Sequence, residues 1–115
     1  EHSALFGGGG GVKKVYNKLV RDRIPEIIKE AGKNACIRIA DEAEYKHLLR
    51  QKLLEEANEF LESGSPEELA DILEVVAALG GTYGLSFADL VKMAEEKRMD
   101  RGGFEERIVL LYVNG

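Results

Sequence analysis

The chain has 115 residues, of which 44% are hydrophobic and 32% charged, a balance typical of one soluble globular domain with a modest core. The formal net charge of -5 argues against an extended nucleic-acid polymer as a partner. One cysteine and two histidines exclude an internal disulfide and supply few ligands for zinc. No apolar run approaches the roughly 20 residues of a membrane span, and no signal peptide is evident, so we expect a cytoplasmic protein without membrane contact.

The first eleven residues end in a run of five glycines and show no hydrophobic periodicity. This composition predicts a disordered leader, and the lack of an initiator methionine agrees with a segment left from recombinant expression. Residues 12–115 are then predicted to form a single domain. Within it, a short helix is expected to start at Pro25, which suits a first helical turn, and to stop at Gly32.

A second, longer helix is expected over about residues 42–62. Asp41 can cap its start, and Glu44 stands at the position that completes a capping box. An apolar stripe recurs at three- and four-residue steps along this helix, which predicts that one face is buried. The stripe consists of Tyr45, Leu49, Leu53, Ala57 and Phe60, with Leu61 near its edge.

The following helix is expected over residues 66–83. Ser65 can cap it, with Glu68 in position for a capping box. This helix is apolar nearly all round, and such a helix is normally buried. After its first turn the only charges are Asp71 and Glu74, which continue the row that Glu68 begins.

Beyond residue 83, a last helix is expected from Ser86 to about residue 100 or 101, where a glycine pair ends it. Two segments rich in β-branched and apolar residues, 35–40 and 107–113, read as short strands that pair with each other. The predicted fold class is therefore mainly α: a helical bundle with a short two-stranded β element.

Carboxylates recur at a spacing of three residues on both long helices. On a helix this spacing places Glu56 and Glu59 one turn apart, and the same holds for Glu68 and Asp71. Projection at 3.6 residues per turn puts Glu56 on the flank of the apolar stripe and Glu59 just beyond it, whereas Glu55 and Glu62 project the other way. If the two helices pack side by side, four carboxylates meet and require a positive ion, for which Mg²⁺ is the natural candidate. The alternative is a solvated acidic surface, which is common on helices.

Basic residues form the second candidate site. Lys97 and Arg101 near the end of the last helix, and Lys18 and Arg21 near the start of the chain, could bind phosphate groups. The alternative is plain surface charge, because cations at a helix C-terminus are also favoured by the helix dipole.

Three stretches together resemble the MazG-like all-α nucleoside triphosphate pyrophosphohydrolases. Residues 55–59 (Glu-Glu-Ala-Asn-Glu) and 68–73 (Glu-Leu-Ala-Asp-Ile-Leu) resemble the paired helical motif of that superfamily. Residues 16–25 and 97–104 resemble a small house-cleaning branch of it that is similar to phosphoribosyl-ATP pyrophosphohydrolase. The gap between the two carboxylate motifs is shorter than in larger MazG proteins, which implies a tight helical hairpin.

The resemblance implies Mg²⁺-dependent hydrolysis of a nucleoside triphosphate, standard or non-canonical, to a monophosphate and pyrophosphate. It implies metal binding by four carboxylates and general-base catalysis by Glu59 or Glu56. Lys97 and Arg101 are the first candidates for binding the phosphates, and Lys18 and Arg21 are the second. Family members are usually homo-oligomers, so a homodimer or higher oligomer is expected. The metal ligands implied are Glu56, Glu59, Glu68 and Asp71.

Two other functions remain open on the sequence. A helical interaction module could keep this fold without catalysis, and its carboxylates would then be surface groups. The third hypothesis is a phosphoribosyl-ATP pyrophosphohydrolase. The Asn-Lys-Leu-Val-Arg-Asp stretch of residues 17–22 argues against it, by resemblance only. The preference for base and sugar depends on pocket shape and is left open.

Overall fold

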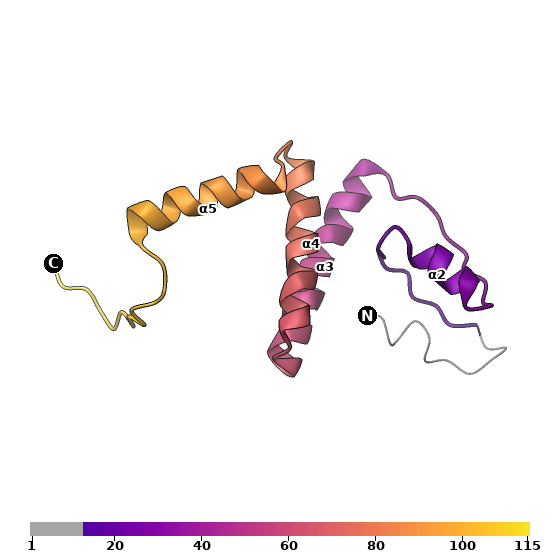
Figure 1. Cartoon of the computed structure of the whole chain (residues 1–115), viewed down its shortest axis with the longest axis horizontal. Helices are drawn as coiled ribbons and strands as arrows, with labels where there is room; N and C mark the ends of the chain where they lie inside the picture. Colours follow the sequence, from indigo (N-terminus) through magenta and orange to yellow (C-terminus); the bar gives the residue numbers. More distant parts are fainter. Residues whose placement is uncertain (1–12) are drawn as a thin grey trace. The chain divides into compact units, whose positions relative to one another are not determined.

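The computed structural model describes residues 13–115, and the predicted leader over residues 1–11 lies outside them. The described chain is mainly helical (Figure 1). It divides into two compact units, Glu1–Val75 and Val76–Gly115, with the boundary inside one helix, so each unit is described by itself. The expectation of a single domain over residues 12–115 stays a prediction. The helices are α2 (Ile24–Glu30), α3 (Glu42–Ser63), α4 (Pro66–Thr82) and α5 (Phe87–Arg101).

Helix α3 begins and ends close to the predicted residues. The side chain of Asp41 accepts a hydrogen bond of 2.8 Å from the backbone N–H of Glu44, which confirms the predicted cap. The predicted capping box is not completed, because both carboxylate oxygens of Glu44 accept hydrogen bonds of 2.6 Å from Arg38. These bonds from Arg38 lower the pKa of Glu44. Gly64 ends the helix with a φ of 65°, a conformation that glycine adopts readily.

The turn between α3 and α4 replaces the second predicted capping box with simpler contacts. The hydroxyl of Ser65 accepts a hydrogen bond of 3.3 Å from the backbone N–H of Glu67. The backbone N–H of Ser65 donates to the hydroxyl of Ser63 at 3.1 Å, which is the role that the capping box assigns to Glu68. The prediction that Glu68 caps α4 is therefore wrong, and its carboxylate lies elsewhere.

The hydrophobic core of the described residues is small. Its buried members are Ile24, Leu49 and Val75, all in the first unit. Leu49 belongs to the predicted stripe of α3 and is 3% exposed, whereas Leu61, at the edge of that stripe, is 78% exposed.

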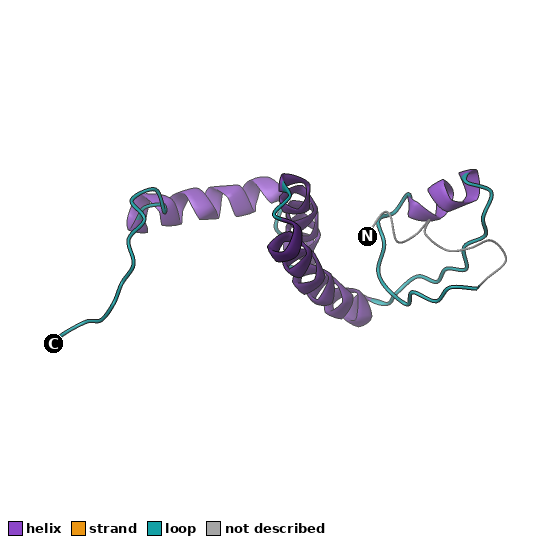
Figure 2. Ribbon diagram, turned by 90° about the horizontal axis from the view of Figure 1, so that it is seen from below, coloured by secondary structure: helices purple, strands orange, loops and turns teal. Residues whose placement is uncertain are grey.

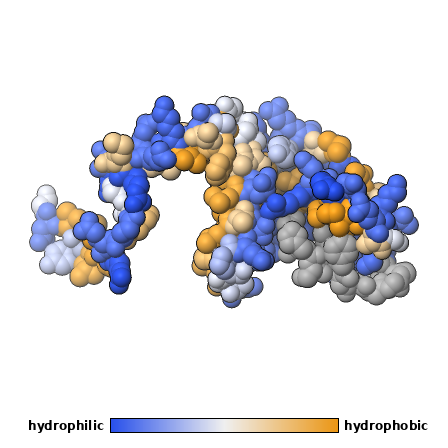
Figure 3. Space-filling model, viewed as in Figure 1, coloured by the Kyte–Doolittle hydropathy of each residue, from blue (hydrophilic) through white to orange (hydrophobic). Residues whose placement is uncertain are grey.

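The prediction that the apolar helix α4 is buried is confirmed for only part of the helix, in which Val75 is buried. Leu69 and Leu73 are exposed, and hydrophobic residues are visible along α4 in the space-filling view (Figure 3). The physical reason is that a neighbouring helix covers one side of its partner, while α4 is apolar on nearly every side. No single described helix is long and apolar enough to cross a membrane; α4 and α5 reach that length and composition only together, as a bent pair.

The second unit contains the end of α4, α5 and the C-terminal segment. Ser86 and Asp89 form a complete capping box at the start of α5, with hydrogen bonds of 2.9 and 3.0 Å. Gly80 permits close packing here, because a Cβ atom at this position would lie 2.6 Å from a methyl carbon of Leu90. Gly102, with a φ of 83°, follows the last residue of α5 as predicted.

The two predicted strands do not form. Residues 35–40 and 107–113 are not assigned as strand, and no strand occurs anywhere in the described chain (Figure 2). Their apolar side chains, such as Ile39 and Val109, are exposed. A β-branched composition favours extended backbone, but a strand exists only through a hydrogen-bonded ladder with a neighbour, which neither segment has here.

Candidate metal centre

Helices α3 and α4 bring five carboxylates together in the first unit. In two overlapping groups, one carboxylate oxygen from each member lies within 4.8 Å of the others. The first group is Glu55, Glu56 and Glu59, and the second is Glu56, Glu68 and Asp71. Because Glu56 belongs to both groups, the five side chains form one cluster, which we call the carboxylate cluster.

Local sequence explains how the carboxylate cluster arises. The two helices follow each other through a turn at residues 64–65, so they lie side by side as a tight hairpin (Figures 1 and 2). A spacing of three residues then stacks two carboxylates on the inner side of each helix. All four predicted metal ligands are thus brought into one place by a segment of the first unit.

Glu56 is the most buried of these groups. Its side chain is 1% exposed, although the sequence pattern placed it only on the flank of the apolar stripe. A buried carboxylate is costly unless positive charge lies close to it. The amine of Lys52, one turn earlier on α3, lies 3.8 Å from a carboxylate oxygen of Glu56 and 3.7 Å from one of Glu55.

Glu68 shows the electrostatic strain of the carboxylate cluster. Loss of solvent raises the pKa of Glu68, and the negative charges of Glu59 and Asp71 raise it further. A carboxyl with a raised pKa binds its proton more tightly in the folded than in the unfolded chain. Its ionisation therefore lowers the free energy of unfolding as the pH rises through its folded pKa. A cation bound between these groups would remove that penalty.

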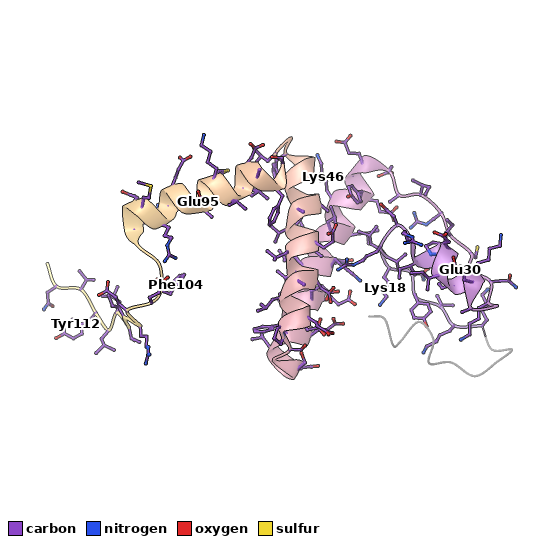
Figure 4. The ribbon with its side chains drawn as sticks, in the orientation of Figure 1. Lys18, Glu30, Lys46, Glu95, Phe104 and Tyr112 are labelled. Carbon is purple, nitrogen blue, oxygen red and sulfur yellow. The ribbon has the colours of Figure 1, made fainter. Side chains whose placement is uncertain are left out.

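Two cations from the segment before α2 also reach the carboxylate cluster. Arg21 donates a hydrogen bond of 2.6 Å to Asp71. The amine of Lys18, a residue labelled in Figure 4, lies 3.5 Å from Glu55. The chain bends near this point through Asn17, which has a positive φ of 46°. The structure thus places both predicted phosphate-binding residues of this segment at the carboxylates.

Glu55 was not predicted to belong here, and its expected orientation away from the other carboxylates is wrong. Glu55 lies within ion-pair distance of the amines of both Lys18 and Lys52. Lys52 itself was also missed, although its spacing of three and four residues from Glu55 and Glu56 is the spacing of helical ion pairs. Glu62 and Glu74 are exposed and lie outside the carboxylate cluster.

Lys97 and Arg101, the other predicted phosphate-binding residues, belong to α5 in the second unit and are exposed. They are therefore not among the residues that the first unit brings to the carboxylates. Near them, Arg98 pairs with Glu105 and lowers the pKa of that carboxyl. The two side chains lie against Gly103, where a Cβ atom would require their flexible ends to shift.

The donor set of the carboxylate cluster suits a hard divalent cation. All five ligand candidates offer carboxylate oxygens, which Mg²⁺ and Ca²⁺ prefer, and no nitrogen or sulfur ligand that zinc favours joins these groups. Glu68 adds an oxygen that is buried and receives no hydrogen bond from a described residue. Such an oxygen is well suited to a metal ion.

Comparison with known proteins adds no family to this geometry. No family model matches the chain, and neither a curated protein nor a solved structure matches it.

Proposed function

We propose that the chain is a nucleoside triphosphate pyrophosphohydrolase that requires Mg²⁺. One observation carries the proposal: carboxylates of Glu56, Glu68 and Asp71, from two different helices, converge within 4.8 Å, with Glu56 buried and the other two half-buried. Repulsion among them is compatible with a stable fold when a cation binds there. The resemblance of residues 55–59 and 68–73 to the paired motif of the MazG-like enzymes supports the same assignment.

In this proposal the four predicted ligands hold the metal, and the chemistry is a displacement at the α-phosphorus. A bound Mg²⁺ supplies charge neutralisation to the triphosphate and lowers the pKa of water. Water oxygen forms a bond to the α-phosphorus, the bond to the bridging oxygen breaks, and pyrophosphate leaves. Glu59, which lies next to the second group of carboxylates, accepts the proton that the water loses.

Lys18 and Arg21 are suited to hold the phosphate groups. Both already lie at the edge of the carboxylate cluster, and a triphosphate brought there by the metal would come within reach of their cationic groups. Arg21 can bind two phosphate oxygens at once, because its guanidinium presents parallel donors. Lys97 and Arg101 remain candidates for the same task from the second unit.

Product analysis tests the proposal. The protein should convert at least one nucleoside triphosphate, from a panel of standard and damaged ones, to a monophosphate and pyrophosphate in millimolar Mg²⁺. EDTA should abolish the reaction, because the charge of the phosphates is then not neutralised. Chromatography of a single-turnover reaction identifies the products. A diphosphate with orthophosphate would refute attack at the α-phosphorus, and no turnover of any triphosphate would favour the interaction module.

A second part of the proposal concerns assembly. Leu69 and Leu73 on α4, together with Leu54 and Leu61 on α3, leave the helical hairpin with exposed apolar side chains. Isolated exposed leucines are normal, but several on one small hairpin mark a surface for a protein partner. A second copy of this chain is the partner that the resemblance to oligomeric enzymes implies.

The mass of the protein in solution tests the proposed oligomer. Light scattering after size exclusion should give a wild-type mass of at least two chains. The double variant Leu69→Lys, Leu73→Lys should have the mass of one chain, because charged side chains oppose burial at an interface. Met99→Lys is the control, since Met99 is also apolar and exposed but lies on α5. A wild-type mass of one chain at 100 µM or so would reject the oligomer.

A further inference from the structure

Lys52 is buried at the carboxylate cluster, an unusual position for a lysine. It is 7% exposed, whereas lysine is almost never buried unless it is paired. Its amine lies 3.7 Å from Glu55 and 3.8 Å from Glu56. These separations are those of ion pairs, so the positive charge of Lys52 acts directly on two of the candidate ligands.

The position of Lys52 differs from that of the other cations at the site. Lys18 and Arg21 come from the non-helical segment before α2, and their side chains are more exposed, at 24% and 43%. They can turn toward solvent or toward a phosphate. Lys52 stands on α3 itself, one turn before Glu56, and its surroundings leave it little freedom. Its amine is therefore held close to the carboxylates.

A fixed cation at this position has two opposite effects. Without metal it offsets repulsion among the carboxylates and stabilises the fold. With metal it repels the divalent ion, because like charges at a few ångströms in a partly buried site interact strongly. We propose that Lys52 is a permanent counter-cation of the carboxylate cluster, which stabilises the metal-free fold and limits how tightly the cluster holds a divalent cation.

This proposal rests on the metal site put forward above, and it gives a reason for such a residue. An ion held too tightly by five carboxylates would not leave with the product complex, whereas an exchangeable ion can arrive and leave with the nucleotide. The same lysine lets the hairpin fold before any metal is bound. If Lys52 had only a structural role, its removal would destabilise the metal-free fold but would not raise the affinity for metal.

The test measures stability and metal affinity separately on Lys52→Met, which keeps an unbranched side chain and removes the charge. In EDTA its melting temperature should fall by roughly 10 °C, because the buried carboxylates lose their partner. Its affinity for Mg²⁺, measured by titration calorimetry, should rise by about tenfold or more, because a repelling charge is gone. Lys52→Arg restores a positive charge and should bring both values back toward those of the wild type.

Lys46→Met is the matched control. Lys46 lies on the same helix and forms the same type of pair, with its amine 3.5 Å from Glu42 four residues away, but the pair is exposed (Figure 4). This variant should change neither the melting temperature nor the Mg²⁺ affinity measurably, because exposed pairs of this kind contribute little. If Lys52→Met does not fold in EDTA, recovery of its helical signal in millimolar Mg²⁺ supports the proposal, and failure to fold in Mg²⁺ as well refutes it.

The outcomes separate this proposal from the one on which it rests. If the wild type binds Mg²⁺ but Lys52→Met binds it equally or more weakly, Lys52 positions ligands or only fills space, and the counter-cation role is wrong while the metal site stands. If the wild type shows no heat of Mg²⁺ binding and no rise in melting temperature up to millimolar concentrations, the metal site itself is wrong, and the role of Lys52 falls with it.

Discussion

Replacing Asp71 with asparagine should reduce pyrophosphate release by at least about a hundredfold, because a metal ligand of the second group loses its charge. The fold should persist. Asp71→Asn removes one repelling charge beside Glu68, which is favourable, and weakens the hydrogen bond from Arg21, which is unfavourable. These effects oppose each other, so we expect a melting temperature in EDTA close to that of the wild type. Steady-state turnover and thermal melts are the measurements.

Two further variants are compared with Asp71→Asn in activity and stability. Glu68→Gln should also lose activity and keep the fold, because Glu68 takes no part in the cap of α4. Ser65→Ala should do the reverse: it removes the acceptor for the backbone N–H of Glu67, should lower the free energy of unfolding by about 1 kcal/mol, and should spare most of the activity. Near-normal turnover of Asp71→Asn would show that the carboxylate cluster is not the catalytic site.

Replacing Leu49 with alanine should lower the free energy of unfolding by about 2–5 kcal/mol, the usual loss for a buried leucine. The effect is large for this chain because so few hydrophobic side chains are buried in the described part of it. Leu49 also lies on the helix that carries Glu55, Glu56 and Glu59, so loosening it should weaken the carboxylate cluster as well. Chemical denaturation followed by circular dichroism measures the change.

Leu61→Ala is the matched control for Leu49, since both are leucines on α3 and Leu61 is 78% exposed. In the single chain this variant should change the free energy of unfolding by less than about 0.5 kcal/mol. Equal losses for the two variants would mean that α3 buries a different face from the one described. A large loss for Leu61 that depends on protein concentration would instead point to burial in an oligomer.

The sequence by itself determined the helices and most of their ends. Aspartate, serine and glycine at positions 41, 86 and 64 act through their own backbone neighbours, so local chemistry is enough to place the ends of α3 and the start of α5. The three-residue spacing of Glu56 and Glu59 and of Glu68 and Asp71 is likewise local. Convergence of these pairs followed from one further assumption, that consecutive helices joined by a short turn lie side by side.

Packing decided the features that local patterns left open or placed wrongly. Glu68 could satisfy a cap or join the carboxylates, and the hydrogen bond from Ser65 to Ser63 removed the first role. Residues 35–40 and 107–113 have the composition of strands, but a strand requires a partner ladder, and none forms.

The most important contribution of the tertiary structure is the set of cations around the carboxylate cluster. Arg21 meets Asp71 across fifty residues of sequence, a distance that no local pattern spans. The sequence pattern missed Glu55 and Lys52 because the average helical period alone does not determine which side chains at the edge of the stripe lie against a neighbouring helix. Residue spacing thus determined which carboxylates could meet. Burial and long-range ion pairs, which depend on how the helices pack, determined which charged groups surround the carboxylate cluster.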